Sequence, residues 1–566
     1  MGLARATRNL ARTARANPMW ALLSILLAPF RFARHIIGVV LFTMVLFVAQ
    51  FLLLMLTVWY FGLDKNGAVA QLGVFGISGA LVLVMVWMFV LPLLRRFDYD
   101  DSPDTHGSAR FATAGEAQAL NDDHGLLIGR DVKTGKPMRY AGPAHLLTIA
   151  PTRTGKGVGT IIPNLLEYPF AVVCIDPKGE NARIAARQRG KFGAVHVLDP
   201  FGVTGLASAA FNPLDRIDPH GLDLADDCMT LADALVHDAP GEAGDAHWNE
   251  EAKALIAGLL LHIITTEPPA TCTLDTLRDR LTLAPAALAV QLAAMQAQGG
   301  LVARAANRQL GKSDREAAGV LSAAQRHTHF LDSPRMATVL GGSDFTFAGL
   351  KDAPATVFLV LPPDRLASYA RWLRLMVAQA LTELARAPGR PPWPVLFLLD
   401  EFAALGRLEP VERAMGLMAG YGVQLWPILQ DVHQLRALYG QRAGTFLSNA
   451  GVLQVFGVND QDSAKMVSDL AGQETVVFET MSRAIDAEES GLSFGQQHAG
   501  RALLTPDEVR TLRPDRQLLF LAGQRPIVAA KLRYYVDREF AGRFDPAQSI
   551  TAKSFVHKPA ARFKPR

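Results

Sequence analysis

The chain has 566 residues, enough for several domains, and half of them are hydrophobic. Its mean hydropathy is positive, more apolar than a wholly soluble protein requires, whereas the net charge of +4 favours no particular partner. The three cysteines, Cys174, Cys228 and Cys272, lack the spacing of metal ligands, which argues against disulfides and against a zinc site.

Two apolar segments predict an N-terminal membrane anchor over residues 1–98. Residues 36–63 and 72–94 are each long enough to cross a hydrocarbon core of about 30 Å, and the eight residues between them allow only a tight hairpin. Arginines precede the first segment and follow the second, which predicts that both flanks are cytoplasmic. A cleaved signal peptide is the alternative, but the first run is too long for one and a second run follows at once.

A glycine-rich loop, Ala150–Thr160 (APTRTGKGVGT), follows an apolar run and precedes a helix-like segment. Backbone N–H groups of such a loop can cradle phosphates, and Lys156 is placed to reach the β- and γ-phosphates as the helix begins. The candidate nucleotide-binding residues are Thr152, Arg153, Thr154, Gly155, Lys156 and Gly157. By itself the loop is equally compatible with a plain glycine-rich turn.

The loop departs from the P-loop pattern at two positions. Ala150 stands where the first glycine is expected, and Gly157 stands where a metal-binding hydroxyl is expected. Thr154 or Thr160 can supply the missing hydroxyl, and spacing alone does not choose between them.

Short apolar runs separated by helix-period segments predict an α/β fold whose parallel sheet is covered on both faces. These runs are Phe170–Ile175, Ala194–Leu198, Thr356–Leu361 and Val395–Leu399. Residues 99–214 and 342–545 are expected to form the two parts of this body. Between them, residues 215–341 are rich in alanine and leucine and predict an inserted all-α domain. Residues 546–566 form a basic tail, either a solvated end or a contact with DNA or lipid phosphates.

An acidic pair, Asp400 and Glu401, follows the apolar run Val395–Leu399. It is expected at the carboxyl end of a buried strand, where α/β sheets bind ligands. One carboxylate there suits Mg²⁺, directly or through water, and the other can orient an attacking water. A solvated helix cap is the plainer alternative. The next strand-like run ends in Gln430, which can sense the γ-phosphate or simply hydrogen-bond at the strand end.

The order of these motifs resembles the TraG/TraD-like type IV coupling proteins, membrane-anchored ATPases of conjugation and type IV secretion. The resemblance covers most of the chain after the apolar segments. It is carried by HGSARFA (His106–Ala112), APTRTGKGVGTIIPNLL (Ala150–Leu166), DPKGEN (Asp176–Asn181), the LLDEF segment (Leu398–Leu435), the NAGVLQVFGVNDQD segment (Asn449–Val476) and the ALLTPDEV segment (Ala502–Tyr535).

The resemblance implies a RecA-like P-loop ATPase domain with an inserted all-α domain, a two-helix transmembrane anchor, and assembly into hexamers with ATP sites between subunits. It implies that Lys156 is the phosphate lysine, Asp400 the acid linked to Mg²⁺, Glu401 the base that activates water and Gln430 the sensor. An arginine from the next subunit is expected to reach the γ-phosphate. The candidates, among which the sequence does not choose, are Arg371, Arg374, Arg407 and Arg413.

The expected function is that of an inner-membrane ATPase, using ATP and Mg²⁺, that couples relaxase-bound single-stranded DNA to a type IV secretion channel. The 215–341 segment is the expected cargo-recognition domain. One alternative is a coupling protein whose cargo is protein effectors only. Another is a non-hydrolysing membrane docking receptor, although a site that only binds has no need of Glu401. A chromosome-segregation translocase is less compatible, because no helix-turn-helix candidate occurs near the C-terminus.

Overall fold

The computed structural model describes residues 33–62, 105–118, 124–236, 246–483 and 492–547, together with isolated positions before residue 121. The chain divides into two compact units, residues 1–105 and residues 106–566. All but the first two residues of the predicted basic tail lie outside the described part.

The first unit contains helix α4 (Ala33–Phe61). The second predicted span, residues 72–94, lies outside the described residues except for three positions. Throughout the described part of the chain, no helix has both the length and the apolar character that crossing a bilayer requires. The predicted multi-pass inner-membrane localisation is therefore wrong. Apolar runs satisfied the compositional signal, but a span also requires a continuous helix that meets both conditions.

The second unit is built on a sheet of eleven described strands, in the order β2-β1-β13-β12-β9-β3-β8-β7-β4-β6-β5. Seven of them, from β9 to β5, run parallel, and β12, β13, β1 and β2 extend the sheet in antiparallel fashion. The parallel strands are β3 (His145–Ile149), β4 (Val172–Asp176), β5 (Ala194–Leu198), β6 (Ala355–Val360), β7 (Val395–Leu399), β8 (Val423–Leu429) and β9 (Ala450–Val455). The antiparallel strands are β1 (Leu126–Asp131), β2 (Pro137–Tyr140), β12 (Arg516–Leu521) and β13 (Ile527–Ala530).

Alternating side chains of the central strands enter two separate cores, one on each face of the sheet. On β7, Phe397 belongs to one buried cluster, and its neighbours Leu396 and Leu398 belong to the other. Because successive side chains of a strand point to opposite faces, a strand covered on both sides must be apolar throughout, and all five residues of β7 are buried. This confirms the predicted α/β arrangement.

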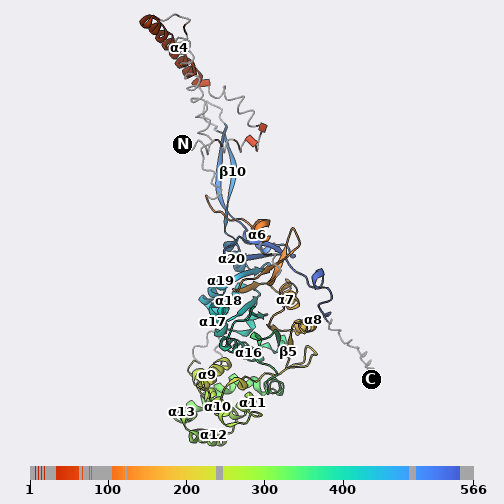
Figure 1. Ribbon diagram of the computed structural model, residues 1–566. Coiled ribbons are helices and arrows are strands. Elements are labelled where there is room, and N and C mark those ends of the chain that lie inside the picture. The colour runs from red at the N-terminus through yellow and green to blue at the C-terminus, as the bar shows by residue number, and fades with distance from the viewer. Residues whose placement is uncertain are drawn as a thin grey trace, which may run out of the picture. The chain divides into compact units, whose positions relative to one another are not determined.

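Helices cover both faces. One face carries α7 (Ile162–Glu167) and α8 (Glu180–Arg189). The other carries α16 (Leu366–Arg386), α17 (Glu409–Leu417), α18 (Val432–Tyr439), α19 (Ala443–Asn449) and α20 (Gln461–Ala471) (Figure 1). Two short helices, α6 (Ala114–Gln118) and α21 (Pro506–Arg510), precede β1 and β12 respectively. Strand β10 (Gln473–Arg483) pairs with β11 (Leu492–Ala502) as a separate two-stranded ribbon.

The stretch between β5 and β6 is helical in all its described elements. They are η2 (Pro213–Arg216), α9 (Leu224–Leu235), α10 (Ala246–Thr266), α11 (Leu274–Leu281), α12 (Pro285–Gln298), α13 (Gly300–Leu310), α14 (Asp314–Thr328), η4 (His329–Asp332), α15 (Pro334–Val339) and η5 (Ala348–Lys351). Their apolar core is continuous with that of the sheet: Leu231 on α9 and Leu381 on α16 belong to one buried cluster. The inserted helices therefore share stabilising contacts with the α/β body.

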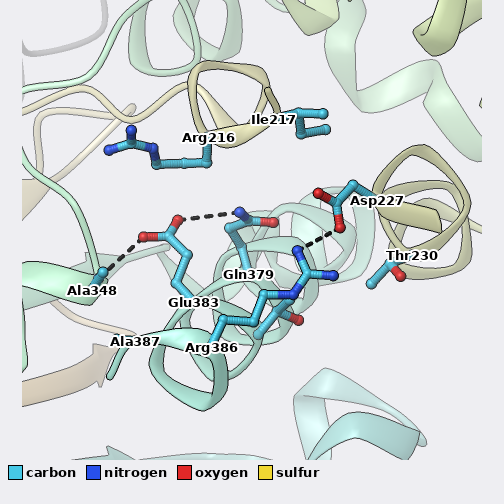
Figure 2. Close-up of a pocket in the computed structure, with 10 residues that line it drawn as sticks. Arg216, Ile217, Asp227, Thr230, Ala348, Gln379, Glu383, Arg386 and Ala387 are labelled. Atoms are coloured by element: carbon cyan, nitrogen blue, oxygen red, sulfur yellow. Dashed lines mark hydrogen bonds and ion pairs between the residues drawn. The ribbon is translucent and has the colours of Figure 1, made fainter. Parts of the chain in front are cut away.

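A cavity of about 320 Å³ lies between α9, η2 and α16 (Figure 2). On its wall Glu383 accepts hydrogen bonds from Gln379 and from the backbone of Ala348, each at 3.1 Å. Arg386 on α16 forms an ion pair with Asp227 on α9 at 2.5 Å. Burial raises the pKa of Glu383, and the two hydrogen bonds oppose that shift. None of the predicted nucleotide residues lines this cavity.

Candidate nucleotide-binding and hydrolysis site

Three neighbouring parallel strands, β3, β8 and β7, deliver the predicted motifs to one edge of the sheet. The glycine-rich loop follows β3, Gln430 follows β8, and Asp400 and Glu401 follow β7. Because the strands are parallel, their carboxyl ends meet at the same edge, where α/β sheets bind ligands. Segments some 250 residues apart in sequence are brought together in this way.

The loop turns sharply between β3 and the helix that follows it. Its start is tied to the sheet by the Ala150 N–H, which donates to the Leu429 carbonyl at 2.8 Å. Arg153 and Gly155 both have positive φ, 66° and 95°, and Lys156 is the N-cap of a π-helical turn, η1 (Gly157–Ile161), which continues into α7. The loop thus ends with backbone N–H groups at a helix N-terminus, the arrangement that binds phosphate.

Backbone strain is concentrated in the two motifs. Among the described residues, only Arg153 (φ 66°) and Glu401 (φ 50°) are non-glycine residues with positive φ. Such a conformation costs on the order of 1–3 kcal/mol and persists only where the surrounding structure imposes it. One strained residue lies in the phosphate loop and the other is the candidate base, which is the clustering expected at a functional site.

Lys156 contacts both carboxylates of the acidic pair. Its Nζ lies 2.5 Å from Glu401 Oε1 and 3.0 Å from Asp400 Oδ1. The side chains of Lys156 and Asp400 are only 15% and 14% exposed, so this is a mostly desolvated cluster of one positive and two negative charges. The excess negative charge fits a site that receives a divalent cation, since Mg²⁺ is usually held by one or two carboxylates together with substrate phosphates.

The three ionisable groups respond differently to burial. Burial raises the pKa of Asp400, and the attraction of Lys156 only partly offsets that shift. For Glu401 burial also acts upward, but the hydrogen bond and charge of Lys156 outweigh it and the pKa lies below its usual value. Burial opposes the charge on Lys156, yet Asp400 and Glu401 together hold its pKa above the usual value. A second cation would therefore stabilise the ionised form of Asp400 more than that of Glu401.

Gln430 links the acidic pair to the loop. Its Nε2 donates to Glu401 Oε2 at 3.1 Å, and its Oε1 accepts from the Thr152 hydroxyl at 3.2 Å. The position of Gln430 is fixed because Asp431, next to it, caps α18 by accepting from the Gln434 N–H at 2.9 Å. A continuous chain of polar contacts therefore runs from the loop through Gln430 and Glu401 to Lys156.

The two threonines considered for a metal-binding hydroxyl have different surroundings. Thr160 is fully buried, and its hydroxyl donates to Gln454 Oε1 at 3.0 Å within a network that includes Thr148. Thr154 is half-buried in the loop, and its hydroxyl donates to the Pro151 carbonyl at 2.6 Å. Thr160 is therefore committed to the sheet, and Thr154 is the better placed of the two. Thr152 and Arg153 are exposed, and Gly157 opens the π-helical turn.

Lys531, to which sequence reasoning assigned no role, supports the loop from the side of β13. Its Nζ donates to the Thr154 and Phe456 carbonyls, each at 3.0 Å, and lies 4.6 Å from the centroid of the Phe456 ring. Burial lowers the pKa of Lys531 to about 8. The sequence offers a single weak signal for this residue, a lysine that directly follows a strand.

Asp176 is the first residue of the DPKGEN segment (Asp176–Asn181), and the sequence alone assigns it no role. It ends β4, the neighbour of β7, and accepts from the Ala182 N–H at 2.8 Å. Burial raises its pKa to about 6, and the nearby Asp400 carboxylate acts in the same direction. Its position next to Asp400 is decided by strand order, which no local signal reveals.

The four arginine candidates separate by burial. Arg374 is buried, and its Nη1 donates to the Leu405 and Arg407 carbonyls at 2.7 and 2.6 Å, so it holds the loop after Glu401 in place. Arg407 faces Glu409 at 3.5 Å and Glu412 at 3.8 Å. Arg413 is exposed on α17, and Arg371 is half-buried on α16. Of the four, Arg374 is the one buried against backbone carbonyls of its own chain.

The chain is similar in sequence to known proteins over most of its length. Residues 110–558 match the family described as Type IV secretory system Conjugative DNA transfer. A conjugal transfer protein TraG of Escherichia coli is 30% identical over 502 residues, which cover 77% of this chain and 78% of the relative. Protein VirD4 of Rhizobium rhizogenes is 28% identical over 495 residues, covering 82% of this chain and 69% of the relative.

Solved structures of the plasmid coupling protein TrwB share the fold. The unbound form of TrwBdeltaN70 gives a TM-score of 0.60 at 20% identity, covering 78% of this chain and 95% of that chain. TrwB in complex with the non-hydrolysable ATP analogue ADPNP gives a TM-score of 0.59 at 18% identity, with the same coverage of 78% and 95%. The sheet and its helices therefore have the α/β P-loop ATPase fold seen in TrwB.

Proposed function

Because this chain belongs to the Type IV secretory system conjugative DNA-transfer family, we propose that it is a coupling ATPase, which hydrolyses ATP with Mg²⁺ to move DNA toward a type IV secretion channel. The observation that carries this function is the cluster of Lys156, Asp400, Glu401 and Gln430 at the carboxyl edge of the sheet.

Each residue of the cluster has a distinct part in binding and hydrolysis. Lys156 leaves the carboxylates to contact the β- and γ-phosphates, while the N–H groups of the loop and of η1 hold the phosphate oxygens. Asp400 would hold Mg²⁺, directly or through water, and the ion would supply positive charge to offset that of the phosphates. The nucleotide-binding segment is Thr152, Arg153, Thr154, Gly155, Lys156 and Gly157, and the Thr154 hydroxyl is the candidate metal ligand.

Glu401 is the base in this mechanism. Once Lys156 turns to the phosphates, Glu401 Oε1 becomes available to accept a proton from the attacking water, while Gln430 continues to orient the carboxylate through Oε2. Loss of the γ-phosphate returns Lys156 to Glu401. Gln430, bonded to both Glu401 and Thr152, is placed to sense that change.

We further propose homo-hexamers with the nucleotide between subunits, in keeping with the family. Arg371, Arg407 or Arg413 then supplies the charge that stabilises the transferring phosphoryl group from the next subunit. The cargo is single-stranded DNA carried with a relaxase, and residues 215–341 recognise it. The inserted helices lie between β5 and β6 in sequence, apart from the proposed nucleotide residues, which supports assigning cargo recognition and nucleotide binding to different segments.

The test is ATP binding and hydrolysis by the purified chain. Lys156→Ala removes a charge-assisted contact with phosphate, so nucleotide affinity is expected to fall about 10–100-fold. Asp400→Asn is expected to abolish the turnover that Mg²⁺ supports in the wild type. Lys465→Ala, an exposed lysine on α20, is the matched control. Undiminished turnover in both site variants rules out the assigned site.

A further inference from the structure

A basic and aromatic cluster lies at the carboxyl ends of β5 and β6. This is the same edge of the sheet as the one that carries the nucleotide residues. Phe201 follows β5, Arg335 comes from α15, and Arg365 is the last residue of η6 (Pro363–Arg365), which follows β6 and directly precedes α16. The guanidinium carbons of Arg335 and Arg365 lie 5.8 and 5.6 Å from the centroid of the Phe201 ring. Tyr369 on α16 packs edge-on against the same ring at 5.1 Å. We call these four residues the Phe201 patch.

The two arginines keep their charge available. Arg335 is exposed and donates to the Pro200 carbonyl at 3.2 Å, and no carboxylate of the described residues lies within ion-pair distance of it. Arg365 is 52% exposed and, among the described residues, pairs only with the neighbouring Asp364, itself 70% exposed, at 3.2 Å. An exposed pair of this kind contributes little and exchanges readily for a stronger anion. The Phe201 ring holds both guanidinium groups in place through cation–π contacts.

This combination fits single-stranded nucleic acid. Guanidinium groups bind backbone phosphates through charge-assisted hydrogen bonds, and their planar faces, like aromatic rings, stack on unpaired bases. An acidic peptide would use the charges alone and would have no need of the aromatic side chains. Because phosphate contacts and stacking are both independent of base identity, a site of this type suits a cargo of arbitrary sequence.

Helix α16 connects the patch to the hydrolysis site. It carries Tyr369 in the patch and, slightly further on, Arg374, which holds the Leu405 and Arg407 carbonyls in the loop that follows Glu401. A displacement of that loop on nucleotide turnover therefore has a rigid element through which it can reach the patch, and the reverse also holds.

We propose that the Phe201 patch binds the phosphate backbone of single-stranded DNA and transmits its occupancy to the ATP site through α16. This inference rests on the proposed function and names the surface through which it acts. Phe201 and Tyr369 set the geometry, and Arg335 and Arg365 make the contacts with phosphate.

The test is binding of a fluorescent oligodeoxythymidine to the full chain across a series of salt concentrations. Arg335→Gln combined with Arg365→Gln is expected to weaken binding about tenfold and to reduce the slope of log affinity against log salt by about 1.4, since each phosphate contact on a single strand contributes about 0.7. Arg510→Gln with Arg538→Gln, two exposed arginines on α21 and after β13, removes the same charge outside residues 215–341. This control is expected to bind like the wild type.

Stimulation of ATP hydrolysis by the oligonucleotide gives the second readout. The patch variant is expected to keep its basal turnover and lose most of the stimulation, whereas the control keeps both. Equal losses in the two variants, or unchanged binding in the patch variant with its fold intact by circular dichroism, overturn the proposal while leaving the ATPase assignment in place. A wild-type chain with no basal turnover contradicts the proposed function itself, and a turning-over chain that does not bind the oligonucleotide overturns the patch.

Discussion

Lys156 donates to Glu401 Oε1 at 2.5 Å across 245 residues of sequence, which joins the proposed phosphate-binding lysine to the proposed base. The same lysine is expected to serve the phosphates, so the carboxylate and the nucleotide compete for one cation. In the proposed mechanism this competition makes the pair a two-position switch: Lys156 restrains Glu401 while it faces the carboxylate, and Glu401 becomes available as a base when the lysine turns to the phosphates.

Replacing Glu401 by glutamine tests this competition. Glu401→Gln removes the negative charge that holds Lys156, so ATP affinity is expected to stay equal or to rise by up to about fivefold, the effect of roughly 1 kcal/mol. Hydrolysis is expected to fall by about 10²–10⁴-fold, since the base is lost. Equilibrium binding and single-turnover assays measure the two effects separately. The matched control is Glu250→Gln on α10. Weaker ATP binding by Glu401→Gln would contradict the competition.

Gln430 is expected to matter for turnover and not for binding. Gln430→Ala removes the hydrogen bonds to Glu401 and Thr152. Hydrolysis should fall about fivefold, because the bond that orients the Glu401 carboxylate contributes about 1 kcal/mol. ATP affinity should change less than twofold. Gln441→Ala, at an exposed glutamine, provides the comparison. A large loss of affinity with normal turnover would show that Gln430 shapes the loop and does not act on Glu401.

Lys531 is expected to set the position of the phosphate loop. Lys531→Met keeps the aliphatic stem over Phe456 but loses the bonds to the Thr154 and Phe456 carbonyls, so ATP affinity should fall about tenfold. Turnover at saturating ATP should change much less. Lys531→Arg, which keeps the charge and the donors, should recover part of the affinity. An unchanged KM in the methionine variant would show that the loop holds its shape without this lysine.

The lowered pKa of Lys531 is expected to make both ATP affinity and stability depend on pH. As pH rises through about 8 the amine loses its charge, so ATP affinity should decline in the wild type and remain flat in Lys531→Met. Stability responds with the opposite sign. Folding lowers this pKa from 10.5, so between about pH 8 and 10.5 the unfolded chain binds more protons, and the contribution of Lys531 to the free energy of unfolding rises with pH. Isothermal binding and thermal melts on both chains measure the two trends.

Arg374 is expected to act through stability. Arg374→Met leaves the Leu405 and Arg407 carbonyls without their buried donor, which should lower the free energy of unfolding by about 2–4 kcal/mol. Arg413→Ala, at an exposed position, should change it by less than about 0.5 kcal/mol. Denaturant melts measure the difference.

Mixing Arg413→Ala chains with Glu401→Gln chains tests whether Arg413 acts between subunits. If it does, a site formed by Glu401 of one chain and Arg413 of the other is intact, and two inactive variants restore activity when mixed.

Deletion of residues 215–341 is expected to damage the motor as well as cargo recognition. The inserted helices share one buried core with α16 and the sheet, so their removal exposes residues such as Leu381 to water. The deleted chain should bind a hydrophobic dye and melt at a lower temperature. A deletion that melts like the wild type would show that the α/β body is independent, and its transfer frequency would then report directly on cargo recognition.

The sequence by itself determined the local elements and the candidate site residues. Unbroken apolar runs such as Val395–Leu399 predicted buried parallel strands, because a strand covered on both faces cannot alternate with polar residues. The residues that end those runs, Asp400, Glu401 and Gln430, could be predicted to share an edge because the carboxyl ends of parallel strands coincide. Lys156 followed from the glycine pattern of its loop. All of these signals are local in sequence or periodic.

The tertiary structure decided which of these groups touch and which neighbours they have. Strand order placed Lys156 against Glu401, committed Thr160 to Gln454, set Lys531 beneath the loop and buried Arg374 under the residues that follow Glu401. It also joined the inserted helices to the core of the sheet, and it gave no support to the spans that hydropathy had predicted. Contacts between segments hundreds of residues apart depend on the packing of the whole sheet, and no local pattern of residues encodes them.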